Sequence, residues 1–220
     1  MRTLITVVIL ISSLATAAPA ATLTWTTAYR EAVATPTHPS YTPPNDVKTY
    51  RTTGPWDEQA TATAGALGDA HYATGTATHR STLAGDGMTF YGSVTGTWTG
   101  SARPGLRAAI DSVFTVSADS DWQFSGSGTT ASGTVLTMSI YDFTGGAYLA
   151  QSAWSSAPLF ALDRTVTLLQ GRQYALAVKV LGGGAGSLSA SLTQVPEPTA
   201  LALVALAAPA LLRRRRGAGH

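Results

Sequence analysis

The chain has 220 residues, with 14 Lys and Arg against 12 Asp and Glu, and it has no cysteine. This length allows one domain of ordinary size beside short targeting segments. The lack of cysteine excludes disulfides, thiolate zinc sites and a catalytic thiol. The basic excess lies at the ends: residues 21–194 hold nine basic and eleven acidic side chains, which disfavours a nucleic-acid partner.

The first twenty residues have the pattern of a secretory signal peptide. Arg2 supplies the positive start, residues 4–14 form an apolar stretch, and Ala18-Pro19-Ala20 matches an A-x-A cleavage site. We therefore expect export through the Sec translocon and cleavage between Ala20 and Ala21. An uncleaved N-terminal anchor is the alternative, but the apolar stretch is too short for a comfortable membrane span.

Residues 21–56 predict an extended arm or a long loop. A strand-like stretch at 22–27 opens this segment. Four prolines follow it: Pro36, Pro39, Pro43 and Pro44. Proline at this density prevents a helix and confines strand pairing to sheet edges. We expect the arm to be held on the body by three aromatic side chains: Tyr41, Tyr50 and Trp56.

From Asp57 onward the side chains alternate with a period of two, which is typical of strands buried on one face. Turn signals separate nine or ten short runs, and a Ser/Gly/Thr-rich stretch at 125–133 predicts a loop. Two sets are expected to face the core: Met88, Phe90, Val94 and Trp98, and Tyr174, Leu176, Val178 and Val180. No convincing amphipathic helix interrupts the series. Residues 57–194 therefore predict an all-β, antiparallel β-sandwich of jelly-roll type.

Few side chains suggest chemistry, and no cofactor is expected. Asp69 and His71 could share a metal ion, but a surface Asp and His near a turn are the usual interpretation, so no metal site is expected. His71 and His79 would lie about 26 Å apart on an extended strand unless the chain bends sharply at Gly75. Asp119 and Asp121 form a D-x-D turn that could supply part of a calcium site, although ordinary turn chemistry also explains them. The chain lacks a G-x-S-x-G elbow and a phosphate-binding loop.

Five tryptophans raise the question of a platform for stacking sugars. Trp98 and Trp122 fall on the inferred core faces. The sequence leaves the burial of Trp25, Trp56 and Trp154 undetermined. A glycan-binding surface therefore stays open as an interpretation.

The C-terminus has three parts. Val195, Pro196, Glu197 and Pro198 form an extended motif, because a residue before proline avoids the α region. Residues 199–212 carry no charge and would span only about 21 Å as a helix, against a hydrocarbon core of ~30 Å. We expect this run to form a single, weakly held transmembrane helix. Four cytoplasmic arginines end it: Arg213, Arg214, Arg215 and Arg216.

This order of motif, apolar run and basic end resembles the PEP-CTERM sorting signal of Gram-negative bacteria, over residues 195–216. The resemblance implies recognition by exosortase, a membrane transpeptidase or protease that acts on envelope and exopolysaccharide-associated proteins. Pro209 departs from the pattern, because glycine is the commoner small residue there and proline would kink the helix. The alternative is an ordinary C-terminal anchor that contains the motif by accident.

These features predict an exported, non-enzymatic protein of the cell envelope or extracellular matrix. Its β-domain would face the periplasm while the tail is held in the inner membrane, and the protein would then reach the cell surface or the medium. The expected partners are the Sec translocon, exosortase and exopolysaccharide. Two alternatives remain: a carbohydrate-binding module of the exopolysaccharide matrix, and a small β-sandwich hydrolase with a carboxylate pair or a Ser/His/Asp cluster.

Overall fold

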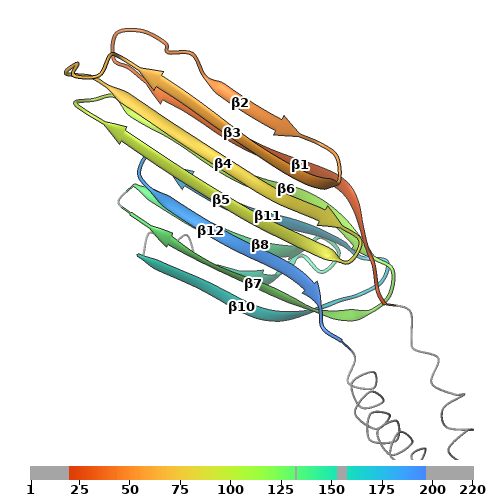
Figure 1. The fold of residues 1–220 in the computed structure, drawn as a ribbon. Helices are drawn as coiled ribbons and strands as arrows, with labels where there is room; N and C mark the ends of the chain where they lie inside the picture. The colour runs from red at the N-terminus through yellow and green to blue at the C-terminus, as the bar shows by residue number, and fades with distance from the viewer. Residues whose placement is uncertain (1–19, 132, 153–157, 197–220) are drawn as a thin grey trace, which may run out of the picture. The chain divides into compact units, whose positions relative to one another are not determined.

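The computed structural model describes residues 20–131, 133–152 and 158–196, and within them all regular structure is β-strand (Figure 1). The strands are β1 (Leu23–Thr37), β2 (Asp46–Tyr50), β3 (Gly54–Ala64), β4 (Ala73–Ala84), β5 (Gly87–Trp98), β6 (Arg103–Val116), β7 (Ser120–Thr130), β8 (Thr134–Asp142), β9 (Ala147–Gln151), β10 (Leu159–Leu168), β11 (Gln173–Gly182) and β12 (Gly186–Gln194). Sheet A has the order β2-β1-β6-β11-β8-β9, and sheet B has the order β10-β7-β12-β5-β4-β3. All pairings are antiparallel, so the predicted antiparallel β-sandwich is confirmed.

The last eight strands pair in a nested order. Strand β5 pairs with β12, β6 with β11, β7 with β10, and β8 with β9. This nesting is that of a jelly roll, in which paired strands wrap around a common core. Strands β1 to β4 then widen both layers: β1 and β2 continue sheet A beyond β6, and β3 and β4 continue sheet B beyond β5.

The core lies between the two sheets and follows the alternation of the strands. On β11, Tyr174, Leu176, Val178 and Val180 are at most 1% exposed, as predicted. Aromatic rings fill the same layer, with Trp122, Phe124 and Phe114 fully buried. Alternate residues on the same strands point outward, and on β7 these are the polar residues Gln123, Ser125 and Ser127.

The predicted loop at 125–133 is wrong over most of its length, because six of its nine residues continue β7 as far as Thr130. Gly126 and Gly128 of this strand face the core, where bulky side chains of β8 pack against them. A Cβ on Gly126 would overlap the sulfur of Met138, and one on Gly128 would lie 2.7 Å from a methyl of Leu136. The glycines that suggested a loop therefore serve close packing between the sheets.

The predicted arm at 21–56 is also wrong, since β1, β2 and the start of β3 belong to the sandwich. Residues 21–194 form one compact unit, in which β1 pairs with β6 from Leu23 to Thr37. Proline is tolerated in β1 because β2 pairs with it only as far as Ala34. Pro36 lies beyond that point, where no strand of the described residues pairs on that side to accept an N–H.

Candidate functional site

The outer face of sheet B is covered by hydroxyl side chains in register. Thr61 lies beside Thr76, and Thr63 beside Thr74, with hydroxyl oxygens 3.1 and 2.9 Å apart. Similar residues continue across β12 and β7, where Ser191 and Ser125 are 3.0 Å apart. These side chains alternate with the buried core residues of the same strands. The face therefore offers many short hydrogen-bonding groups on a stable support.

A first depression of about 410 Å³ lies on this face over β3, β4 and β5. Its outward-pointing residues are Pro55, Asp57, Arg80, Thr82, Thr89 and Tyr91. Tyr91 is 40% exposed, and its side chain lies on the outward face of β5. Beside it, Arg80 Nε and Asp57 Oδ2 form an ion pair at 2.9 Å. An aromatic ring thus stands next to charged and hydroxyl groups.

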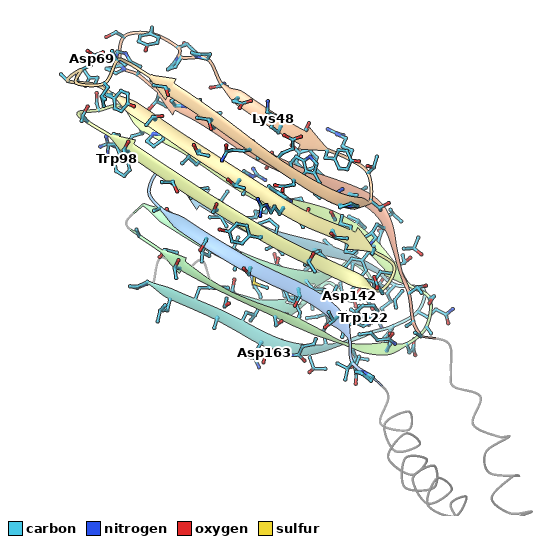
Figure 2. All side chains as sticks on the ribbon, in the orientation of Figure 1. Lys48, Asp69, Trp98, Trp122, Asp142 and Asp163 are labelled. Carbon is cyan, nitrogen blue, oxygen red and sulfur yellow. The ribbon has the colours of Figure 1, made fainter. Side chains whose placement is uncertain are left out.

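A second depression, also about 410 Å³, lies over β12, β7 and β10. Its outward-pointing residues are Ser125, Ser127, Ala161, Asp163, Ser189 and Ser191. Asp163, labelled in Figure 2 on β10 at one edge of sheet B, accepts a hydrogen bond from the side chain of Gln123. Small side chains make this region shallow and polar.

Beneath the first depression lies a buried polar cluster of Arg30, His79 and Ser81. Arg30 is fully buried and donates to the carbonyls of Thr52 and Gly54 and to the Ser81 hydroxyl, the last at 3.2 Å. The rings of Tyr50 and Trp56 cover its guanidinium, with centroids 4.8 and 5.9 Å from the central carbon. Burial lowers the pKa of Arg30, but arginine keeps its charge in proteins. The cluster ties β1 to β3 and β4.

His79 is neutral, and its hydrogen bonds define its tautomer. Nδ1 lies 3.1 Å from the carbonyl oxygen of Glu31 and must donate to it, so Nε2 accepts from the Ser81 hydroxyl at 2.7 Å. Burial and, to a smaller extent, the nearby charge of Arg30 lower the pKa of His79 to about 4, although the hydrogen bond to the carbonyl of Glu31 opposes this shift. The buried imidazole of His79 is therefore uncharged at neutral pH.

The Ser81–His79 pair has the hydrogen bonding of a nucleophile and its base. Its third partner is a backbone carbonyl, however, and both side chains are buried. The rings of Trp56 and Phe90 pack on the imidazole, with centroid separations of 4.4 and 5.0 Å. Ser81 borders the first depression but is only 6% exposed, and its hydroxyl is already bonded to His79 and Arg30. The Ser81–His79 pair therefore does not support the hydrolase hypothesis, because its serine is not accessible as a nucleophile.

The residues considered for metal binding have other partners. Asp69 Oδ2 accepts from the backbone N–H of Ala66 at 2.6 Å, and His71 Nδ1 accepts from the N–H of Ser101 at 3.2 Å. Asp119 and Asp121 each accept a separate hydrogen bond, from the Gln170 N–H and the Thr167 hydroxyl, both at 2.7 Å. In the described ranges, three or more His, Cys, Asp or Glu side chains nowhere gather to hold a metal ion.

The four tryptophans that the structure describes do not form the sugar platform that the sequence left open. Trp25 packs on Phe114 and donates to the carbonyl of Ala84 at 2.9 Å, and Trp56 stacks on Tyr50. Trp122 is buried as predicted. The burial expected for Trp98 is wrong: its ring is 37% exposed because β5 ends there, and Arg103 covers one side (Figure 2). Trp154 lies outside the described residues.

The targeting residues lie at the limits of the described chain. Ala20 is exposed and Ala21 is buried in the sandwich, so the predicted cleavage point falls where the compact unit 21–194 begins. Val195 and Pro196 follow that unit. The rest of the motif, Glu197 and Pro198, lies beyond the described residues, as do the apolar run 199–212 and the arginines 213–216. In the part of the chain that is described, no helix has the length and apolar character needed to cross a membrane.

The exposed aromatic residue of the site, Tyr91, was missed in the sequence. The alternation along β5 could have indicated that Tyr91 is exposed. Met88, Phe90 and Val94 define the inward face of the strand, and Tyr91 is an odd-numbered residue that points to the opposite face. The pairing of Asp57 with Arg80 could not be seen, since it requires the register between β3 and β4.

Comparison with known proteins finds no matching family model and no matching curated protein. Among solved structures, the C-terminal CBM6 of LamC, a marine laminarinase from Zobellia galactanivorans, is 11% identical with a TM-score of 0.26, over 41% of this chain and 79% of that one. The enzymatically active domain of tailspike protein 4 from bacteriophage CBA120 is 12% identical with a TM-score of 0.27, over 62% of this chain and 19% of that one. Likenesses this weak carry no argument about function. The resemblance of residues 195–216 to a PEP-CTERM signal therefore stays a prediction.

Proposed function

We propose that this chain is an exported cell-envelope or matrix protein whose β-sandwich binds polysaccharide on the outer face of sheet B. The observation that carries the proposal is the exposed ring of Tyr91 beside the Arg80–Asp57 ion pair, within a depression lined by threonine hydroxyls. Sugars present both apolar C–H faces and hydroxyl groups. A ring, a planar guanidinium and a carboxylate on one rigid surface match both kinds of group.

The arrangement favours binding over catalysis. The depression is shallow and open, and Arg80 and Asp57 neutralise each other across adjacent strands. A glycosidase needs two carboxyl groups that flank the bond to be cut. Among the described residues, Asp57 is the one carboxylate that lines the first depression, so this part of the surface supports recognition of a glycan and shows no acid–base pair.

The route by which the protein travels is the second part of the proposal. The predicted cleavage point, between Ala20 and Ala21, and the predicted sorting motif, which begins at Val195, flank the compact unit 21–194 directly. Processing at both ends would therefore release a complete sandwich. We propose that the tail holds the protein in the inner membrane until exosortase acts on the motif, and that the sandwich then joins the exopolysaccharide.

A glycan array tests the binding proposal. Residues 21–194, which contain all twelve strands, are applied to neutral and acidic glycans together with the variant Tyr91→Ala. The matched control is Tyr148→Ala, because Tyr148 is an exposed aromatic residue (53%) on β9 of the other sheet. We expect binding that Tyr91→Ala abolishes and Tyr148→Ala retains. Equal signals from both variants would reject sheet B as the binding face.

A further inference from the structure

We infer that the binding surface is one continuous track that crosses all six strands of sheet B and takes an internal segment of a linear, neutral polysaccharide. This inference rests on the proposed function and adds the extent of the site and the class of its ligand. It is drawn from the register of the strands, which places the two depressions in line.

Both depressions lie on the same two rows of cross-strand partners. One row is Asp57, Arg80, Tyr91, Ser189, Ser127 and Ala161. The other row is Pro55, Thr82, Thr89, Ser191, Ser125 and Asp163. The first depression covers these rows on β3, β4 and β5, and the second covers them on β12, β7 and β10. Because Tyr91 and Ser189 are direct partners, the depressions meet between β5 and β12.

The length of the track determines what can fill it. Five strand spacings of ~4.8 Å give a track of about 24 Å, which runs across the strands from β3 to β10 (Figure 1). Both are edge strands, and no further strand pairs beyond them in the ranges that the structure describes. The track is thus open at its two ends, so a polymer can enter and leave it without a chain end at the site.

The charges along the rows favour a neutral polymer. Arg80 is the one cationic residue of the two rows, and Asp57 pairs with it. At the far edge Asp163 adds a negative charge, bonded to Gln123. A polyanionic chain would meet no surplus of positive charge here. The serine hydroxyls on β12 and β7 instead offer donors and acceptors suited to sugar hydroxyls.

The test compares short and long ligands on the full-length protein, purified in detergent. The probes are neutral glucan, xylan, mannan and galactan oligosaccharides, each as a dimer and a hexamer, titrated by calorimetry. Ser127→Gln and, independently, Ser189→Gln fill the second depression with a polar side chain. The matched control is Thr95→Gln, because Thr95 is exposed on the outer face of β5 but lies outside both rows. Tyr91→Ala reports on the first depression.

We expect at least one hexamer to bind about tenfold more tightly than its dimer. Ser127→Gln and Ser189→Gln should each remove that advantage. Ser127→Gln should leave the dimer affinity unchanged, because Ser127 lies two strands from Tyr91. Thr95→Gln should alter neither affinity, and Tyr91→Ala should weaken both. If the two serine variants keep the full hexamer affinity while Tyr91→Ala loses it, the extended track is wrong and the proposed function stands. If no neutral probe binds, this inference fails, while the glycan array with its acidic glycans still decides the proposed function. If Tyr91→Ala binds as the wild type does, both fail. Thermal unfolding confirms that each variant is folded, and either serine variant alone decides the question.

Discussion

His79 Nε2 lies 2.7 Å from the hydroxyl oxygen of Ser81, inside the sandwich and beneath the face that carries the candidate site. The same hydroxyl accepts a hydrogen bond from Arg30. In the described residues, the guanidinium of Arg30 donates hydrogen bonds to carbonyls and to this hydroxyl, and to no carboxylate. A second cation here would be costly, because two like charges would share a core without water. The support of the site therefore depends on a neutral imidazole.

Acid should weaken the fold through His79. Its pKa is about 4 in the folded protein against 6.5 ordinarily, so between these values the unfolded chain binds the extra proton. Stability from this group is complete above pH 6.5 and is lost as the pH falls toward 4, by about 3 kcal/mol. Urea unfolding at pH 7 and 4.5 measures the loss. His79→Phe should flatten the pH dependence and His38→Gln should not; an unchanged slope in His79→Phe would disprove the assignment.

The turn after β8 should depend on Asp142. Burial would raise the pKa of this carboxyl, but hydrogen bonds from the N–H groups of Gly145 and Thr144 and from Arg172 hold it below its ordinary value. Asp142→Asn should lower the free energy of unfolding by about 1–3 kcal/mol, because the carboxylate accepts all three bonds. Asp86→Asn, in an exposed hairpin turn, should change it by less than about 0.5 kcal/mol. Equal effects in urea unfolding would contradict the role given to Asp142.

The interior of β11 should be far more sensitive than its outer face. Leu176 is 1% exposed, so Leu176→Ala should cost about 2–5 kcal/mol through lost burial and a cavity. Lys179 points outward and pairs with Asp111 at 2.6 Å, so Lys179→Ala should cost no more than about 1 kcal/mol. Denaturant unfolding of the two variants compares them directly. A larger loss for Lys179→Ala would mean that the strand faces are reversed.

Alternation along the strands was enough to predict the fold class and much of the core. It correctly placed Phe90 and Leu176 inside, because burial of one sheet face imposes a period of two. It failed where small residues serve packing: Gly126 suggested a loop, yet it admits the side chain of Met138. It failed again at Pro36, because tolerance of a proline depends on whether a neighbouring strand is present.

The candidate site was less predictable, because the register between the strands determines which residues lie side by side in it. The Tyr91–Ser189 and Asp57–Arg80 contacts join residues far apart in sequence, and a shift of one residue would bury these side chains. Local patterns do not determine such a register over twelve strands. The Ser81–His79 pair was equally hidden, because its environment depends on β1 and β3.

The proposed sorting tail should fail in two distinguishable ways. Replacing residues 213–216 with serine should let the weak anchor slip through the membrane, because the positive charges hold the orientation, and should release unprocessed protein. Glu197→Ala should leave insertion intact and block processing, so that unprocessed protein stays in the inner membrane. Fractionation and immunoblotting in the native host separate these outcomes. Normal processing of Glu197→Ala would leave a plain anchor as the explanation.

The central claim is that Tyr91 anchors a polysaccharide on sheet B. The most direct measurement is the affinity of residues 21–194 for exopolysaccharide of the native host, compared among the wild type, Tyr91→Phe and Tyr91→Ala. Since stacking needs the ring and not its hydroxyl, Tyr91→Phe should bind within about threefold of the wild type, and Tyr91→Ala should bind at least about tenfold more weakly, a difference of ~1.4 kcal/mol. Equal affinity of wild type and Tyr91→Ala, with both proteins folded, would contradict the account.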